Sequence, residues 1–254
     1  MNTPWFSVPV PSAQARARLF CMPYAGSGAS CYHAWSRAFA GDGIEVRSVQ
    51  LPGRESRLRE LPFTAMAPLV SALTDHVALL TDRPFGFFGH SMGALVAFEV
   101  ARELQHRGVK GPDFLCASGA GAPQIPREDE PLHMLPDDEF VRQVSEKYQG
   151  IPPQVLQHTE LLELILPALR ADLSVIENYQ FVEGDRLRCA ISVFSGADDE
   201  HVTPEKIAPW EHLTSSHYAC RIFPGDHFFL NDNRDELIRA VRGEFQQMEH
   251  PSAC

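Results

Sequence analysis

The chain has 254 residues, of which 44% are hydrophobic and 22% are charged, and this suits one folded domain with a buried core rather than a disordered chain. Its formal net charge of −11 at pH 7 argues against nucleic acid as a partner. It has no apolar run of about 18 residues, and its first residues lack the basic and apolar parts of a secretory signal, so we expect no membrane span and a cytoplasmic location.

Strand-like apolar runs alternate with helical patterns along most of the chain. The predicted strands lie at about residues 17–22, 44–50, 85–89, 113–118, 188–194 and 218–223. The predicted helices lie at about residues 65–81, 92–107, 204–212 and 232–247. This alternation is typical of the α/β class, in which helices cover both faces of a mostly parallel sheet. We therefore predict a single α/β domain over residues 1–254.

The first predicted strand leads into a glycine-rich loop at residues 23–29, before a helix expected around Trp35. Small residues let the main chain approach a ligand closely. We expect the main-chain N–H of Ala25 to be one donor of an oxyanion hole. The pattern Gly26-x-Gly28 is weak evidence by itself, because many such loops are only turns.

Gly89-His90-Ser91-Met92-Gly93 follows an apolar run at residues 84–88 and opens a helical segment at residues 94–107. A sharp strand-to-helix turn of the form G-x-S-x-G is typical of a nucleophile elbow, which exposes the serine hydroxyl above the sheet. The helix N-terminus also provides unpaired N–H groups where an oxyanion would form. Ser91 is therefore the predicted nucleophile, and the N–H of Met92 is the second predicted oxyanion donor.

Between about residues 131 and 182, helical patterns follow one another without a strand. They cover residues 137–148, 153–158 and 161–179. An all-helical insertion between two strands is typical of a lid. Its apolar residues recur at helical spacing, so most should pack the lid onto the core and a few should line a substrate channel: Leu161, Leu162, Ile165, Leu166 and Leu169.

A nucleophilic serine needs a base, and the base needs an acid that orients it. His227 lies on a loop just after the last predicted strand, which would bring its imidazole to the same sheet edge as Ser91. Ser91, an acid and His227 then follow the chain order typical of this kind of elbow. His227 is the predicted base. His90 is expected to brace the elbow and His201 to lie on a surface loop, and no histidine pair has the spacing of a metal site.

Two adjacent aspartates, Asp198 and Asp199, follow the strand at residues 188–194. The turn reads G-x-x-D-x-x-V only with Asp199 as the acid, so we predict that Asp199 orients the base. Asp198 is then expected to be a turn residue that bonds nearby backbone N–H groups. Glu128 and Asp129, after the preceding strand, are the next candidates.

The cysteines and one basic cluster have structural interpretations as well. Four cysteines fall in apolar runs without a C-x-x-C pair and are expected to be buried, reduced thiols: Cys21, Cys116, Cys189 and Cys220. Cys31 and Cys254 are expected to be incidental. Arg54, Arg57 and Arg59 form a compact cluster that is either a docking patch, where charge reversal at Arg57 would raise KM, or a solvated loop with Arg54 tied to a carboxylate.

Several segments together resemble the type II thioesterases that accompany polyketide synthases and nonribosomal peptide synthetases, over about residues 18–244. They are the loop at 20–29, Leu51-Pro52-Gly53-Arg54-Glu55-x-Arg57, the elbow, the stretch at 161–172 and Gly225-Asp226-His227-Phe228-Phe229. One departure is Tyr24, where the family commonly has histidine.

The resemblance implies an α/β-hydrolase fold with a helical lid and a Ser-His-Asp acyl-enzyme mechanism. It also implies acyl or peptidyl carrier proteins as partners, whose phosphopantetheine arm presents the thioester, and an editing role. No metal or bound cofactor of the enzyme itself is expected.

Two other functions remain open. One is a stand-alone carboxylesterase, or a product-releasing or cyclising thioesterase. The releasing type is disfavoured because its acid often follows the earlier strand, whose continuation here, Gly119-Ala120-Gly121-Ala122, has no carboxylate. The more distant alternative is a non-catalytic binding protein, which would normally have lost one member of the triad, whereas Ser91, Asp199 and His227 are all present.

Overall fold

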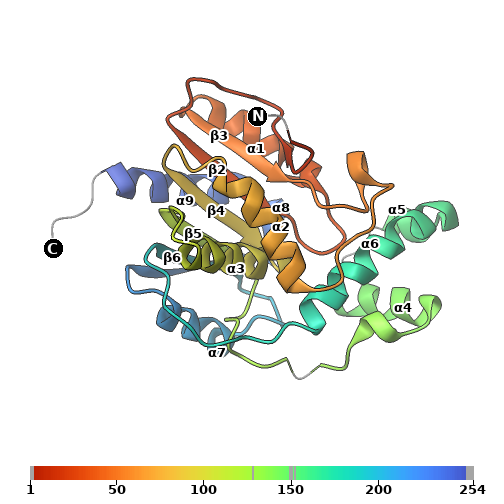
Figure 1. Ribbon diagram of the computed structural model, residues 1–254. Helices are drawn as coiled ribbons and strands as arrows, with labels where there is room; N and C mark the ends of the chain where they lie inside the picture. The colour runs from red at the N-terminus through yellow and green to blue at the C-terminus, as the bar shows by residue number, and fades with distance from the viewer. Residues whose placement is uncertain (1–2, 128, 149–150, 152, 250–254) are drawn as a thin grey trace.

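A computed structural model describes residues 3–127, 129–148, 151 and 153–249 (Figure 1). Within these residues a seven-stranded sheet has the order β1-β3-β2-β4-β5-β6-β7. Strands β2 to β7 pair in parallel, and the short β1 pairs antiparallel to β3 at one edge. The strands are β1 (Phe6–Ser7), β2 (Ala17–Met22), β3 (Ile44–Val49), β4 (Phe85–His90), β5 (Phe114–Ser118), β6 (Ala190–Gly196) and β7 (Tyr218–Phe223).

Helices connect the strands, as the alternating pattern predicts. The α-helices are α1 (His33–Ala40), α2 (Met66–Ala78), α3 (Met92–His106), α4 (Asp137–Tyr148), α5 (Pro153–Leu156), α6 (Thr159–Glu177), α7 (Pro204–Ile207), α8 (Phe229–Asp232) and α9 (Arg234–Glu249). Short 3₁₀ turns are η1 (Ala29–Tyr32), η2 (Glu55–Arg57), η3 (Leu132–Met134) and η4 (Ala208–Leu213). The helix predicted at 204–212 is thus α7 continued by η4. The short β1 was not predicted.

The central strands of the sheet are buried on both faces, and successive side chains of each strand point to opposite sides. In β4, Phe85 and Phe87 join a core cluster with residues of α2 and α3, whereas Phe88 joins a second cluster with residues of α1 and α9. Figure 1 shows α2 and α3 together over the same face of the sheet. This two-sided burial explains why the central strands read as nearly continuous apolar runs.

The predicted insertion forms α4, α5 and α6 between β5 and β6, and these helices gather at one side of the molecule (Figure 1). Leu169 is buried in the core, whereas Leu161 at the start of α6 is 44% exposed. The other three apolar residues named for the insertion are half-buried against the core: Leu162, Ile165 and Leu166. The C-terminal part of α6 therefore fastens the insertion to the domain.

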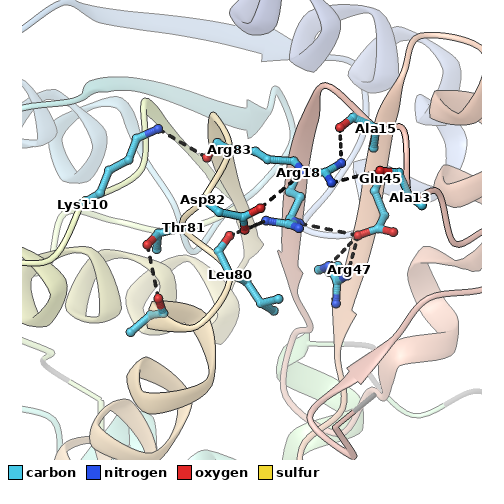
Figure 2. A network of polar contacts seen from close by, with 11 residues as sticks. Ala13, Ala15, Arg18, Glu45, Arg47, Leu80, Thr81, Asp82, Arg83 and Lys110 are labelled. Atoms are coloured by element: carbon cyan, nitrogen blue, oxygen red, sulfur yellow. Dashed lines mark hydrogen bonds and ion pairs between the residues drawn. The ribbon is translucent and has the colours of Figure 1, made fainter. Parts of the chain in front are cut away.

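A buried ion network lies where β2 and β3 begin, at the opposite end of the strands from the elbow. Figure 2 shows Arg18 of β2 between Asp82 and Glu45, and Arg47 paired with the same carboxylate oxygen of Glu45 as Arg18. Glu45 Oε2 also accepts the main-chain N–H of Ser12 at 2.9 Å. Each buried charge has partners, as burial requires, and the network ties β3 to the segment before β2 and to the α2–β4 connection.

Among the cysteines, Cys21, Cys116 and Cys189 are free and buried, as predicted. Cys220 is exposed, so its predicted burial is wrong. It lies on β7, an edge strand whose side chains are largely exposed, and an apolar run alone does not reveal that edge position. Cys254 lies outside the described residues. No helix in the described part of the chain is long and apolar enough to cross a membrane.

Candidate active site

Ser91 stands alone between the last residue of β4 and the first residue of α3, in a strained backbone conformation. Its φ is 53° and its ψ is −116°, a region that residues with a side chain rarely adopt. Its N–H donates to the carbonyl of Ser118 on β5 at 2.8 Å, which holds the turn to the sheet. This is the geometry of a nucleophile elbow.

The two glycines of the elbow are required by close backbone contacts. A Cβ on Gly89 would lie 2.1 Å from the carbonyl oxygen of Gly93, and a Cβ on Gly93 would lie 2.2 Å from that of Met22. These distances are far shorter than any real Cβ contact. The glycines thus let α3 begin directly against β2 and β4, which keeps the serine above the sheet.

His227 and Asp199 form a hydrogen-bonded pair at the ends of β6 and β7. Nδ1 of His227 lies 2.8 Å from Oδ2 of Asp199, and the Asp199 side chain is fully buried. Its other oxygen, Oδ1, accepts the main-chain N–H groups of His201 at 3.0 Å and Val202 at 3.2 Å. The carboxylate is therefore held on both sides, and it fixes the orientation of the imidazole.

The same contacts set the charge of Asp199. Burial by itself would raise the pKa of Asp199, but the hydrogen bond and charge of His227 and the two main-chain N–H groups outweigh burial and lower that pKa. Asp199 is thus ionised at neutral pH, and Nδ1 of His227 carries the proton that it accepts. Within the part of the chain that the structure describes, Nε2 of His227 makes no hydrogen bond, so this nitrogen is available to a substrate or to Ser91.

The neighbouring aspartate does not contact the histidine. The Asp198 side chain is exposed, and its main-chain N–H donates to the carbonyl of Gly225 at 2.9 Å. The expectation that the Asp198 carboxylate would bond backbone N–H groups is wrong, because the Asp199 carboxylate makes those bonds. Asp129 pairs with Lys147 at 2.7 Å, and Glu128 lies outside the described residues.

Parallel pairing brings these side chains to one edge of the sheet, because Ser91, Asp199 and His227 all follow the carboxyl ends of parallel strands. Among the described residues, the Ser91 hydroxyl makes no hydrogen bond. Such contacts are often long in the absence of substrate and shorten when it binds.

His90 packs beneath this group, and the structure agrees with its predicted bracing role. Its ring lies 5.2 Å from that of His227, and its Nδ1 is 3.0 Å from the hydroxyl of Ser118. Burial, together with the nearby His227, lowers the pKa of His90 well below its ordinary value, so His90 is neutral. The ring of Tyr24 lies edge-to-face with that of His90, and Tyr24 belongs to the loop at residues 23–29 that carries Ala25, here named the oxyanion loop.

His201 is half-buried rather than a free surface residue. Its Nε2 lies 2.5 Å from the carbonyl oxygen of Lys147, and its ring lies 5.1 Å from that of Tyr148. His201 therefore joins the turn that carries Asp199 to the C-terminal end of α4.

The two predicted oxyanion donors are main-chain N–H groups without an acceptor among the described residues. Across the described residues, the main-chain N–H groups of Ala25 and Met92 make no hydrogen bond. Ala25 lies in a turn closed by the N–H of Ser27, which donates to the carbonyl of Tyr24 at 3.1 Å. Two free N–H groups beside a strained serine can stabilise negative charge on a carbonyl oxygen.

The basic cluster divides into one exposed and two buried arginines. Arg54 forms a two-pronged ion pair with Asp172 of α6, with N–O distances of 2.5 and 2.7 Å. Arg57 bonds Glu60 and stacks over the Trp5 ring at 4.5 Å. Burial of Arg54 and Arg57 contradicts both the docking-patch interpretation and the solvated loop, whereas the predicted tie of Arg54 to a carboxylate is confirmed.

Asp172 was not predicted as a residue of the site. Besides Arg54, its Oδ2 accepts the main-chain N–H of Gly26 at 2.8 Å, directly beside the Ala25 donor. Its signals in the sequence were its place at the end of the stretch at 161–172, one of the segments that carry the family resemblance, and its position on the buried side of a helical pattern. Elsewhere, the described residues include no group of three or more potential metal ligands.

Residues 17–245 match the thioesterase domain family. The gramicidin S biosynthesis protein GrsT of Aneurinibacillus migulanus is 41% identical over 234 residues, which cover 92% of this chain and 91% of that protein. A protein named linear gramicidin dehydrogenase LgrE, from Brevibacillus parabrevis, is 36% identical over 246 residues, or 95% of this chain and 92% of that protein. The solved structure of the type II thioesterase BorB from the borrelidin biosynthetic cluster has a TM-score of 0.88 at 32% identity and covers 96% of this chain and 98% of that one.

Proposed function

This chain belongs to the thioesterase family, and we propose that it hydrolyses acyl thioesters held on the phosphopantetheine arm of acyl or peptidyl carrier proteins. The observation that carries the proposal is the strained elbow of Ser91 beside the paired side chains of His227 and Asp199. A thioester carbonyl is a suitable electrophile for an activated hydroxyl, because its thiolate is a good leaving group.

In the first half of the reaction, Nε2 of His227 accepts the Ser91 proton while Oγ attacks the thioester carbonyl. The tetrahedral oxyanion is stabilised by the N–H groups of Ala25 and Met92. Asp199 orients the imidazole and stabilises the imidazolium that forms. The C–S bond then breaks, the carrier thiol leaves with a proton from His227, and the acyl group remains on Ser91.

In the second half, His227 removes a proton from water, which attacks the acyl-enzyme through a second oxyanion. Breakage of the ester releases the acid and restores the serine. Each proton transfer is assigned to a side chain of this enzyme or to water, so the proposal requires no metal or cofactor of the enzyme. The phosphopantetheine belongs to the carrier.

The names of the similar proteins support a biosynthetic setting. GrsT is named for gramicidin S biosynthesis, and BorB is a type II thioesterase of the borrelidin cluster. We propose the same kind of role here, in which the enzyme removes aberrant or stalled acyl groups and frees the carrier thiol. A cytoplasmic location is part of this proposal, and the free thiols of Cys21, Cys116 and Cys189 are compatible with it.

The dehydrogenase in the name of LgrE would require hydride chemistry, which this site does not favour. The loop from Gly26 to Cys31 reads G-S-G-A-S-C and lacks the third glycine of the dinucleotide fingerprint. The strained serine and the His227–Asp199 pair are instead the parts of an acyl-transfer site. Hydrolysis through an acyl-enzyme therefore explains the residues of this site better than hydride transfer does.

The test compares one acyl group on two thiols, a phosphopantetheinylated carrier domain and the small thiol N-acetylcysteamine. Contacts with the remote carrier can lower the barrier for hydrolysis, so kcat/KM should be higher for the carrier-bound acyl group. Equal efficiency on both substrates would contradict carrier recognition and favour a general esterase. Hydrolysis of oxygen esters of the same acid serves as the comparison for that alternative.

A further inference from the structure

The oxyanion loop is held from outside by a buried ion pair. Oδ2 of Asp172 accepts the Gly26 N–H at 2.8 Å, and a guanidinium nitrogen of Arg54 lies 2.5 Å from that same oxygen. The same arginine nitrogen donates to the carbonyl of Ser27 at 3.0 Å. Arg54 and Asp172 thus bond two successive residues of the loop, Gly26 and Ser27, directly after the proposed donor Ala25.

These bonds select one of two conformations of the turn from Tyr24 to Ser27. Gly26 is its third residue and has a φ of +77°, as a type II turn requires. In a type I turn the central peptide is rotated by about half a turn, so the Gly26 N–H would point away from Asp172. The carboxylate therefore stabilises the type II form. It also holds Gly26, the residue directly after Ala25, against α6, which limits how far the Ala25 N–H can move.

The same carboxylate belongs to α6, the longest helix of the insertion. Leu169, one turn before Asp172, packs so close to Gly26 that an added Cβ would lie 2.9 Å from Leu169 Cδ1. Both side chains come from one face of α6, because residues three apart on a helix are neighbours. The loop with the oxyanion donor is therefore fastened to the insertion as well as to the sheet.

We propose that Arg54 and Asp172 are positioning residues, which hold the Ala25 N–H in the oxyanion hole and couple it to the seating of α6. The inference rests on the proposed serine-hydrolase mechanism and adds a structural requirement to it. Neither side chain contacts the reacting atoms. Arg54 fixes the Asp172 carboxylate, Asp172 fixes the central peptide of the turn, and the turn presents the donor.

A double variant separates positioning from stability. A buried ion pair can often be replaced by apolar residues of similar size without loss of stability, whereas removal of one partner leaves a buried charge unpaired. Arg54→Met combined with Asp172→Leu should therefore fold, yet it leaves the Gly26 N–H and the Ser27 carbonyl without these partners. We expect the melting temperature to stay near that of the wild type while kcat falls.

The expected loss in kcat is about 10-fold to 100-fold, somewhat less than complete removal of an oxyanion donor costs. KM should change by less than about 3-fold, because acylation and deacylation pass through the same oxyanion and slow together. Asp172→Asn keeps one oxygen that can accept the Gly26 N–H, so its kcat should lie between those of the double variant and the wild type.

Glu45→Gln is the control for Asp172→Asn. It makes the same carboxylate-to-amide change in a buried arginine pair, but at the opposite end of the strands (Figure 2). It should lower the melting temperature and leave kcat unchanged. A purely structural role of Asp172 would give both variants the same behaviour.

A second readout reports on the oxyanion hole directly. An alkyl boronic acid forms a tetrahedral adduct with a catalytic serine, and its affinity depends on the oxyanion donors. Its inhibition constant should rise in the double variant in proportion to the loss of kcat/KM and should not change in Glu45→Gln.

The assay uses an acyl N-acetylcysteamine thioester, so it does not depend on a carrier protein. If wild type and Ser91→Ala hydrolyse it equally, the proposed mechanism fails. If the wild type is active and Ser91→Ala is not, but the folded double variant keeps its kcat and its boronate affinity within about 2-fold, only the positioning proposal is overturned. Should the double variant not fold, wild-type kcat in both Asp172→Asn and Arg54→Lys would overturn the positioning proposal.

Discussion

In the proposed mechanism, the chemistry depends first on the Ser91 hydroxyl, which a strained backbone conformation holds in place. Ser91 has a positive φ that a residue with a side chain adopts only when its surroundings enforce it. The enforcing contacts are main-chain contacts, from the Ser118 carbonyl and from the close approach of Gly93 to Met22. The hydroxyl itself contributes no packing that the fold requires.

Ser91→Ala should therefore remove activity without affecting stability. We expect kcat to fall by roughly 10³-fold or more, because the covalent step disappears, while the melting temperature stays close to that of the wild type. Steady-state hydrolysis of an acyl thioester and thermal unfolding measure the two quantities. Near-normal turnover in this variant would contradict the serine-hydrolase mechanism.

The two adjacent aspartates provide a sharper comparison, because one is buried against His227 and the other is exposed. Asp199→Asn keeps the shape of the side chain but favours the wrong tautomer of His227 and removes the charge that stabilises the imidazolium. We expect a loss of about 10⁴-fold in kcat for Asp199→Asn, measured at pH 7 to 8.

Asp198→Asn is the matched control, and it should cost less than about 3-fold in kcat. The opposite ranking of the two variants would assign the acid to Asp198. Full activity in both would mean that the acid lies elsewhere.

At the scale of elements, η2 and the loop around it belong to the packed body of the domain. Arg57 of η2 stacks on Trp5 and donates to the carbonyl of Gln50 at 3.0 Å. Its neighbour Arg59 is exposed. This segment therefore stabilises the connection from β3 to α2, and only one member of the basic cluster is available to a partner.

Arg57→Glu should destabilise the protein rather than weaken docking. The new carboxylate would face Glu60 and lose the contacts with Trp5 and Gln50, so we expect the free energy of unfolding to fall by more than about 2 kcal/mol. Arg59→Glu should change it by less than about 0.5 kcal/mol. Urea unfolding of both variants measures the difference, and equal stability of the two would mean that Arg57 is not buried as described.

For the whole molecule, stability should depend on pH through the buried His90. Its pKa in the folded protein lies well below the ordinary value of 6.5, chiefly because of burial. Below about pH 6.5 the unfolded chain takes up a proton at this histidine while the folded protein does not, so the free energy of unfolding falls as the pH falls. Above that pH the two states bind protons equally at this site, and the contribution is constant.

His90→Gln should make the stability less dependent on pH between about pH 6.5 and 5, where one proton changes stability by up to about 1.4 kcal/mol per pH unit. Urea unfolding at several pH values gives the slope for each protein. His106→Gln, at a side chain that is 84% exposed, controls for the loss of a histidine. If both variants keep the wild-type slope, His90 does not titrate between the folded and unfolded states in this range.

The proposed active site and the buried ion network lie at opposite ends of the strands. The site lies at the carboxyl ends of β4, β6 and β7, and the ion network of Arg18 and Glu45 lies where β2 and β3 begin (Figure 2). The helical insertion α4–α6 contacts the site at two points. Asp172 of α6 bonds the Gly26 N–H, and His201 lies against the carbonyl of Lys147 at the end of α4. Stability and chemistry can therefore be varied independently at the two ends.

Local patterns in the sequence were sufficient for the α/β class, for the six main strands and for the elbow at Ser91. Periodicity and glycine spacing depend on neighbouring residues, which is why they can be read without the fold. The spacing in the turn after β6 also favoured Asp199 over Asp198. The structure places Asp199 rather than Asp198 against His227.

Only the tertiary structure shows which residues far apart in sequence contact one another. Arg54 and Asp172 are 118 residues apart, and nothing local indicates that α6 brings this carboxylate to the oxyanion loop. The position of a strand within the sheet likewise decides burial, so Cys220 on the edge strand β7 is exposed although its run is apolar. The sequence by itself thus determined which elements form and which residues can do chemistry. Packing decided which charges meet, because charges buried away from water must find partners wherever the fold brings them together.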